Sequence, residues 1–152
     1  MEIRKRLEVG CGVIQEKLED TVYLDIKRFP GVDIIRDLEK GLPFDDNKFY
    51  EIKAHHVLEH VNDLIFVMNE FHRVLKLNGT LDVEVPYGIN SRIDPTHVRF
   101  FTPQGFDFFI HKDFNSVNSG VLGWFELLDL QLNGPSKDDI RGLRFIFKKV
   151  NK

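Results

Sequence analysis

The chain has 152 residues, of which 42% are hydrophobic, and its 21 basic and 24 acidic side chains give a net charge of −3. This mixed charge argues against nucleic acid as a partner, which needs a broad basic face, and no apolar run approaches the ~20 residues that span a bilayer. One cysteine excludes an internal disulfide framework and, with no apolar signal segment behind the basic N-terminus, favours the cytoplasm.

The first three strand-like runs succeed one another closely, at residues 4–9, 22–26 and 33–36. Only residues 13–21 are left between the first two runs, and only residues 27–32 between the second and the third. A crossover between parallel strands normally takes a helix and at least about a dozen residues. We therefore expect the first two crossover helices to be short or missing, and no N-terminal helix before the first strand.

Strands and helices alternate through the middle of the chain. The remaining strand-like runs are residues 50–55, 80–86, 124–132 and 142–150. Apolar side chains at three- and four-residue spacing predict a helix over residues 62–77 that stops at Asn78-Gly79. A second helix is predicted after Thr102-Pro103, as far as about His111. The pattern predicts one α/β domain over residues 1–152, Rossmann-like, with a mainly parallel twisted sheet of about seven strands.

Charged and apolar residues alternate along several of these strands. The charged positions in the first, fourth and fifth runs are Arg4, Arg6, Glu8, Glu51, Lys53, Asp82 and Glu84. In the sixth run, Leu128, Leu130 and Leu132 alternate with polar residues in the same way. A strand that is covered on both faces should read as a continuous apolar run. We therefore predict helices largely on one face and a charged second face that meets water or another chain, with water preferred.

A glycine turn and an acid at a strand end suggest a nucleoside site. Gly10-Cys11-Gly12 comes directly after the first strand, at the edge of the sheet where ligands of open α/β folds bind. Asp25 closes the second strand, where a carboxylate can accept both hydroxyls of a ribose. A NAD domain would show the same pair, and a Gly-x-Gly turn alone is as often purely structural.

With the rest of the chain added, roughly residues 7–110 resemble the class I S-adenosylmethionine-dependent methyltransferases. The resemblance rests on the order and spacing of residues 7–12 (LEVGCG), 37–38 (DL), 41–44 (GLPF), 46–52 (DNKFYEI), 56–60 (HVLEH) and 70–79 (EFHRVLKLNG). It implies S-adenosyl-L-methionine as the cofactor. A dehydrogenase would need a second, substrate-holding domain, for which the chain leaves no room.

The resemblance also implies a set of cofactor-binding residues, which are Glu8, Gly10, Cys11, Gly12, Asp25, Ile26, Asp37, Leu38, Ala54 and His55. In it, Glu8 anchors the turn, Asp25 holds the ribose, and Asp37 with the Leu38 backbone holds the adenine edge. Ala54 and His55, with His56, line the side of the sulfonium.

Two histidines are the candidate catalytic residues, His56 after the fourth strand and His97 in the long connection after the fifth. Alignment of an in-line attack supplies most of the rate of methyl transfer, and a base is needed only for a hydroxyl or ammonium nucleophile. Loops at this edge of the sheet ordinarily carry substrate contacts. Alternatively, His97 is a turn residue held by Asp94, and His60 caps or packs at the start of the helix.

A metal site is a further alternative, because His56, Glu59 and His60 share one strand-to-helix turn. Some quinone-pathway and RNA-end O-methyltransferases look similar here, with Glu-x-x-Glu-His holding Mg²⁺. A histidine in place of their first glutamate weakens a Mg²⁺ site, since Mg²⁺ prefers oxygen ligands. With His97 added, Zn²⁺ or Ni²⁺ could bind. Our prediction is a site without a metal.

The sequence thus predicts a methyltransferase that acts on a small-molecule or sugar-type acceptor, as a monomer or weak homodimer. The alternative is a catalytically degenerate member of the family that serves as a binding or assembly module. Val13 and Ile14 favour this alternative, because they stand where the family usually has a small residue and a glycine. The absence of the usual N-terminal lid favours it as well.

Overall fold

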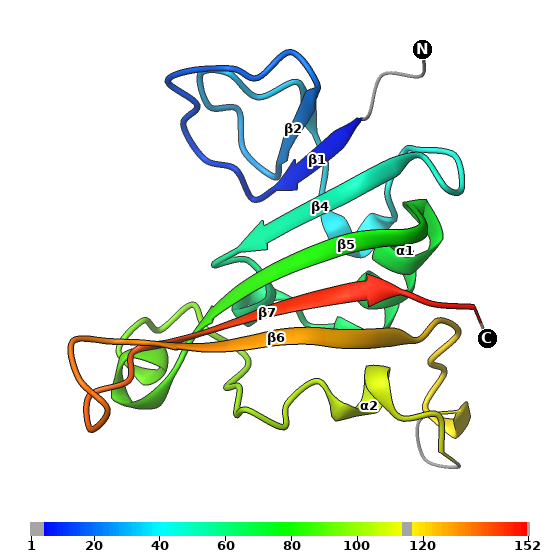
Figure 1. Ribbon diagram of the computed structural model, residues 1–152. Helices are drawn as coiled ribbons and strands as arrows, with labels where there is room; N and C mark the ends of the chain where they lie inside the picture. Colours follow the sequence, from blue (N-terminus) through cyan, green and yellow to red (C-terminus); the bar gives the residue numbers. More distant parts are fainter. Residues whose placement is uncertain (1–4, 114–116, 152) are drawn as a thin grey trace.

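In the computed structural model, which describes residues 5–113 and 117–151, a seven-stranded sheet has the order β3-β2-β1-β4-β5-β7-β6 (Figure 1). The strands are β1 (Arg6–Val9), β2 (Thr21–Asp25), β3 (Ile34–Ile35), β4 (Phe49–His55), β5 (Leu75–Pro86), β6 (Phe125–Asn133) and β7 (Gly142–Lys149). The pairings from β3 to β5 are parallel, and β7 is antiparallel to both of its neighbours. The predicted fold class is confirmed, and β1, β4 and β5 are neighbours in the sheet.

The two connections among β1, β2 and β3 contain no helix in the described residues, as expected from their length. The two loops hold each other instead, because the Ile14 N–H donates to the Pro30 carbonyl at 2.9 Å. The Asp33 carboxylate accepts the Tyr23 N–H at 2.9 Å and pairs with the Lys17 ammonium. The predicted absence of an N-terminal helix concerns residues 1–4, which lie outside the described residues.

Helix α1 (Leu64–Val74) begins two residues after the predicted start, because Asp63 caps it and its side chain accepts the Phe66 N–H at 2.9 Å. It ends three residues earlier than predicted, because Leu75 already pairs with Phe49 in the sheet. Asn78, with a φ of 63°, therefore lies inside β5 and does not cap the helix. With 11 residues, α1 is too short to cross a membrane, and no other described helix has the length and apolarity to do so.

The second predicted helix is wrong in length, because α2 covers only Asp107–Ile110. A turn precedes it, in which the Gly105 N–H donates to the Thr102 carbonyl at 2.8 Å. Packing decides this local structure, since the buried Phe106 ring lies 4.7 Å from that of Phe145. Among the described residues there are also the 3-10 helices η1 (Leu38–Lys40), η2 (Leu58–His60) and η3 (Gly88–Arg92).

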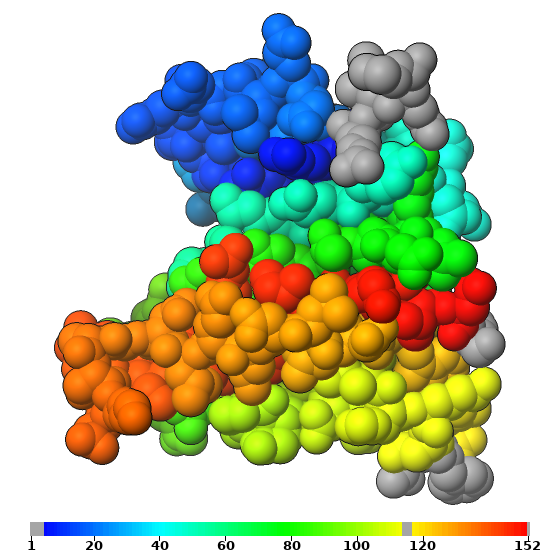
Figure 2. All heavy atoms as spheres, viewed as in Figure 1, coloured from blue at the N-terminus to red at the C-terminus, as the bar shows by residue number. Residues whose placement is uncertain are grey.

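One face of the sheet is covered and the other is not. Helix α1 lies behind the sheet in Figure 1, and Figure 2 shows strand side chains at the surface of the opposite, uncovered face. Arg6 stands beside Glu51, and Lys53 stands between Glu8 and Asp82, in register. The predicted one-sided sheet with a charged second face is confirmed. The predicted position of Arg4 falls outside the described residues.

The alternation predicted for the sixth strand is wrong in part. A bulge between Leu127 and Asp129 shifts the register against β7, so Leu127 and Leu130 pack against the core. Leu128 and Leu132 are instead 49% and 52% exposed. An extra residue in a strand reverses the faces of those after it. This bulge lies on an edge strand, where bulges are frequent.

Candidate cofactor and catalytic site

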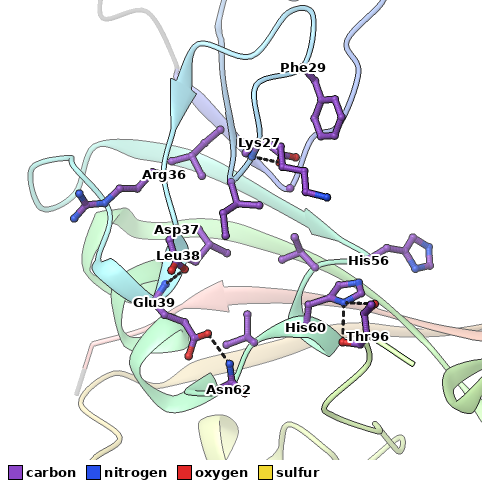
Figure 3. A pocket seen from close by; sticks show the side chains of 16 residues that line it. Lys27, Phe29, Arg36, Asp37, Leu38, Glu39, His56, His60, Asn62 and Thr96 are labelled. Carbon is purple, nitrogen blue, oxygen red and sulfur yellow. Dashed lines mark hydrogen bonds between the residues drawn. The ribbon is translucent and has the colours of Figure 1, made fainter. Parts of the chain in front are cut away.

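A cavity of about 560 Å³ lies at the carboxyl ends of β1, β2 and β4 (Figure 3). It is lined by Gly10, Leu24, Asp25, Ile26, Lys27, Phe29, Arg36, Asp37, Leu38, Glu39, His56, Val57, His60, Val61, Asn62 and Thr96. Sites in open α/β sheets are expected at this edge of the sheet. Strand ends and the loops after them build this cavity, so the missing crossover helices do not remove it.

The glycine turn after β1 requires glycine at Gly10. Its φ is +61°, and a Cβ atom at this position would lie 1.9 Å from Cγ2 of Val57. Gly12 also has a positive φ, of +60°, and its N–H donates to the Asp25 carboxylate at 2.9 Å. The turn is therefore fastened to the end of β2 and brings bare backbone to the wall of the cavity.

Asp25 is the buried acid of the site, with 6% of its surface exposed. One carboxylate oxygen accepts the Gly12 N–H and the other accepts the Lys27 N–H, both at 2.9 Å. A carboxylate has about four acceptor positions. Two of them thus remain for hydroxyl groups of a ligand, while the backbone bonds fix the orientation of the side chain.

A second acidic side of the cavity is built around η1. The Asp37 side chain accepts the Glu39 N–H at 2.9 Å and so caps η1. Glu39 accepts the Asp63 N–H at 2.8 Å and the Asn62 amide at 3.1 Å, and these bonds lower the pKa of its carboxyl group. These contacts tie η1 to the start of α1 (Figure 3).

Histidines gather at the other end of the cavity. His56 has a φ of +54°, and its Nδ1 and Nε2 atoms lie 3.6 Å from Glu59 and 3.3 Å from Glu84. The hydrogen bond with Glu59 is the largest cause that raises the pKa of His56. His60 Nδ1 faces the Thr96 carbonyl at 3.2 Å (Figure 3). His97 lies behind this wall, with its Nε2 atom 4.0 Å from Glu59.

The structure brings some of the predicted cofactor residues together and not others. Those that line the cavity are Gly10, Asp25, Ile26, Asp37 and Leu38, together with His56. Glu8 and His55 lie on the uncovered face, where they contact Lys53 at 3.2 Å and Asp82 at 3.0 Å. Ala54 is in the core. For these three residues, as for those that line the cavity, the assignment to the cofactor stays a prediction.

Cys11 is half-buried in the turn and does not line the cavity. Burial and the nearby Asp25 carboxylate raise the pKa of its thiol to about 11. The thiol is therefore protonated at neutral pH and is a poor nucleophile.

Sequence reasoning missed several polar residues of the wall, namely Lys27, Arg36, Glu39, Asn62 and Thr96. Lys27 comes two positions after the predicted acid Asp25, and Arg36 comes one position before Asp37. Thr96 belongs to the loop that was expected to contact the substrate. These residues could have been suspected because they lie close to predicted strand ends. A position in the sequence does not, however, show which side chains face the cavity.

The chain is thus a Rossmann-like α/β domain with a cavity at the carboxyl ends of its parallel strands. The family described as Methyltransferase domain matches residues 14–83. A demethylmenaquinone methyltransferase of Chlorobaculum tepidum is 36% identical over 53 residues, which are 35% of this chain and 22% of that protein. The match thus spans well under two thirds of the relative's length.

Solved structures show the same fold over nearly the whole chain. A 1,6-didemethyltoxoflavin-N1-methyltransferase of Burkholderia thailandensis, with S-adenosylhomocysteine bound, has a TM-score of 0.67 at 14% identity, over 97% of this chain and 72% of that one. The 4+2 cyclase SpnF has a TM-score of 0.70 at 17% identity, over 98% of this chain and 75% of that one. The chain therefore has the fold of these solved structures, and residues 14–83 resemble the methyltransferase domain in sequence.

Proposed function

We propose that this chain is an S-adenosylmethionine-dependent methyltransferase that acts on a small-molecule or sugar-type acceptor. The observation that carries the proposal is the cavity wall in which Gly10, Asp25 and Asp37 meet at adjacent strand ends. The backbone of Gly10 lies beside the buried Asp25 carboxylate, which has acceptor positions left for a ligand. Asp37 follows the next strand, β3. The bound S-adenosylhomocysteine of the Burkholderia thailandensis structure supports the choice of cofactor.

Each part of the cofactor has a matching group in this wall. Asp25 would accept the two ribose hydroxyls, and Asp37 with Leu38 would take the adenine edge. The methionine part would lie against the backbone at Gly10. The remaining end of the cavity, where His56 and His60 stand, would then face the sulfonium and the acceptor.

The reaction itself needs little beyond alignment. Bound S-adenosyl-L-methionine would supply the methyl group: the acceptor's nucleophilic atom would bond to the methyl carbon as the carbon–sulfur bond breaks, and the electron pair of that bond would stay on sulfur. Holding the two reactants in line supplies most of the rate. When the nucleophile is a hydroxyl or an ammonium group, His56 takes its proton. His97 would assist from behind the wall, through its contact with Glu59.

The proposal extends to the setting in which the protein works. We infer a single methyltransferase-like domain over residues 1–152 that acts in the cytoplasm as a monomer or weak homodimer. The mixed charge balance of 21 basic and 24 acidic residues supports a small-molecule acceptor over nucleic acid.

Calorimetry with S-adenosylhomocysteine tests the proposal directly. The intact chain should bind the ligand at a 1:1 ratio. Asp25→Asn should weaken binding about 10- to 100-fold, because it removes a charged acceptor worth ~1.5–3 kcal/mol. Asp20→Asn is the matched control: Asp20 lies just before the other end of β2, pairs with Arg6 at 3.5 Å and should leave the affinity unchanged.

Two outcomes would count against this assignment. An unchanged dissociation constant in the Asp25→Asn variant would remove Asp25 from the site. No heat of binding to the intact chain at millimolar ligand would favour the alternative, a degenerate family member that serves as a binding or assembly module.

A further inference from the structure

A cluster of metal-ligating side chains lies behind one wall of the cavity. Glu59, His60 and His97 each offer one ligand atom, and these three atoms all lie within 4.8 Å of one another. The three residues come from two separate segments, η2 and the loop after η3. The fold therefore has to bring them together, which spacing in the sequence alone does not do.

Glu59 is the most unusual member of this cluster. Only 1% of its surface is exposed, and its Oε2 atom has no hydrogen-bond partner among the described residues. Its Oε1 atom lies 3.6 Å from Nδ1 of His56 and 4.0 Å from Nε2 of His97. A buried acceptor without a partner is costly, and a carboxylate more so. A cation bound between Glu59 and the histidines would remove this cost.

The two histidines are held in the way that metal-bound histidines are. His97 Nδ1 lies 2.8 Å from the Ser91 carbonyl, and His60 Nδ1 lies 3.2 Å from the Thr96 carbonyl. A ring nitrogen that donates to a backbone carbonyl leaves the other nitrogen, Nε2, with a free lone pair. In His97 that Nε2 atom is the one that faces Glu59.

The loop that carries His97 is fastened to η2 by its backbone. The N–H groups of Val98 and Arg99 both donate to the Glu59 carbonyl, at 2.8 and 3.2 Å. The Arg99 guanidinium also donates to the Val61 carbonyl at 2.7 Å. These bonds hold the two segments together without a metal, so the ligand atoms are brought close before any ion binds.

Although the sequence alone led us to predict a site without a metal, we propose from this geometry that Glu59, His60 and His97 form a site for a divalent transition-metal ion of the Zn²⁺ type. Two imidazoles and one carboxylate are a known Zn²⁺ set that leaves a further position open. Imidazole nitrogen suits Zn²⁺ and its neighbours, whereas Mg²⁺ demands oxygen ligands. In a tetrahedral site with Zn–N bonds of ~2.0–2.1 Å, ligand atoms are about 3.3–3.5 Å apart. Small rotations of the side chains would close the present spacing to this range.

The ion would lie at the end of the cavity assigned to the acceptor, because His60 and Thr96 line it there. If the chain is a methyltransferase as proposed above, the open position on the metal would take a hydroxyl or carboxylate oxygen of the acceptor. Only this step of the inference depends on the proposed function. A metal-bound hydroxyl ionises more readily. The inference therefore narrows the acceptor class to molecules that present such an oxygen.

Calorimetry with Zn²⁺, on the full chain without any affinity tag and without cofactor, tests the site. We expect one ion per chain and much weaker binding of Mg²⁺. Glu59→Gln keeps the shape of the buried side chain, and His97→Ala removes one imidazole. Loss of a residue that only supports a metal ligand weakens metal binding ~10–100-fold. We expect each of these variants, which removes a ligand itself, to weaken Zn²⁺ binding at least as much. His111→Ala, which alters an exposed histidine outside the cluster, should bind as the intact chain does.

Two further measurements distinguish loss of the metal site from misfolding and from loss of cofactor binding. Co²⁺ in place of Zn²⁺ should give visible d–d absorption bands, which should be lost in Glu59→Gln, while circular dichroism shows that the variant is folded. S-adenosylhomocysteine affinity should not change in Glu59→Gln, because Glu59 does not line the cavity. Failure of the cofactor proposal thus leaves the metal result standing. Zn²⁺ that does not bind, or binds equally to both cluster variants, overturns the site.

Discussion

On one face of the sheet, Ile52, Val83 and Phe147 are completely buried, whereas on the other face Arg6, Lys53 and Glu84 keep between 26% and 45% of their side chains exposed. Both sets come from neighbouring strands and, in part, from adjacent positions of one strand. The difference arises because successive side chains point to opposite faces and because the first two crossovers carry no helix to cover the second face.

The comparison also explains why the candidate site survives the loss of those helices. The residues that form the cavity lie at the strand ends and in the loops beyond them, such as Gly10 after β1 and Asp25 at the end of β2, and the strands are positioned by the covered face alone. Leu7 and Val9 of β1 are each 1% exposed on that face. Packing on the covered face therefore suffices to fix the strand ends, and the charged side chains keep the other face of the sheet in contact with water.

The largest effect is expected on the covered face. Phe147→Ala should lower the free energy of unfolding by about 3–5 kcal/mol, because it removes a fully buried ring that stacks on Phe145. Ile146→Ala is the matched control on the same strand, with its side chain on the uncovered face, and should cost much less. Urea denaturation of both variants measures the difference. Equal losses would mean that the two faces are not energetically distinct.

An intermediate effect is expected from the most buried charge of the uncovered face. Asp82 is 8% exposed, and its carboxylate accepts two hydrogen bonds from Arg144, at 2.9 and 2.7 Å. Arg144→Ala should cost about 1–3 kcal/mol at neutral pH, because it leaves Asp82 without this partner. Arg141→Ala, which breaks the exposed pair with Asp139, should cost less than about 1 kcal/mol.

The cost of Arg144→Ala should also depend on pH. Burial raises the pKa of Asp82, but the hydrogen bonds from Arg144 and His55 outweigh it, so that the net pKa is lowered. A lowered folded-state pKa gives stability that is present above the unfolded value of ~3.9 and is lost as the pH falls through the folded value. The gap between the intact chain and the variant should therefore narrow below about pH 4. Unfolding curves at pH 7 and pH 3 show whether it does.

Sequence patterns predicted the two faces well, because alternation at Leu7, Glu8 and Val9 is a local property that packing did not override. Where a bulge intervenes, as between Leu127 and Asp129, the same pattern failed in part, since Leu128 falls outside the regular pairing with β7. The length of α2 failed for another reason. Aromatic packing of Phe106, which depends on distant strands, decided the local backbone.

The site was predictable at the ends of strands and not beyond them. Gly10 and Asp25 could be predicted to line the cavity, because a glycine turn and an acidic residue at strand ends can be recognised in the sequence. The side chains of Glu8 and His55 point to the uncovered face, because successive residues of a strand alternate between the two faces. A motif match does not show which way a side chain points. The sequence suggested that His97 could join His56, Glu59 and His60, but only the structure shows that its Nε2 atom lies 4.0 Å from Glu59, 38 positions earlier in the chain.

The smallest effect is expected at the exposed pair of the uncovered face, where Lys53 contacts Glu8 at 3.2 Å with both side chains partly in water. Lys53→Gln should change the free energy of unfolding by no more than about 0.2–1 kcal/mol, and added salt should reduce even that. A second copy of the chain on this face would bury the pair and make it costlier to break. Stability would then rise with protein concentration, because association stabilises the folded state by mass action. Denaturation of the intact chain and of Lys53→Gln at two concentrations a hundredfold apart separates the cases: concentration-independent curves with a small difference between them mean that this face meets water.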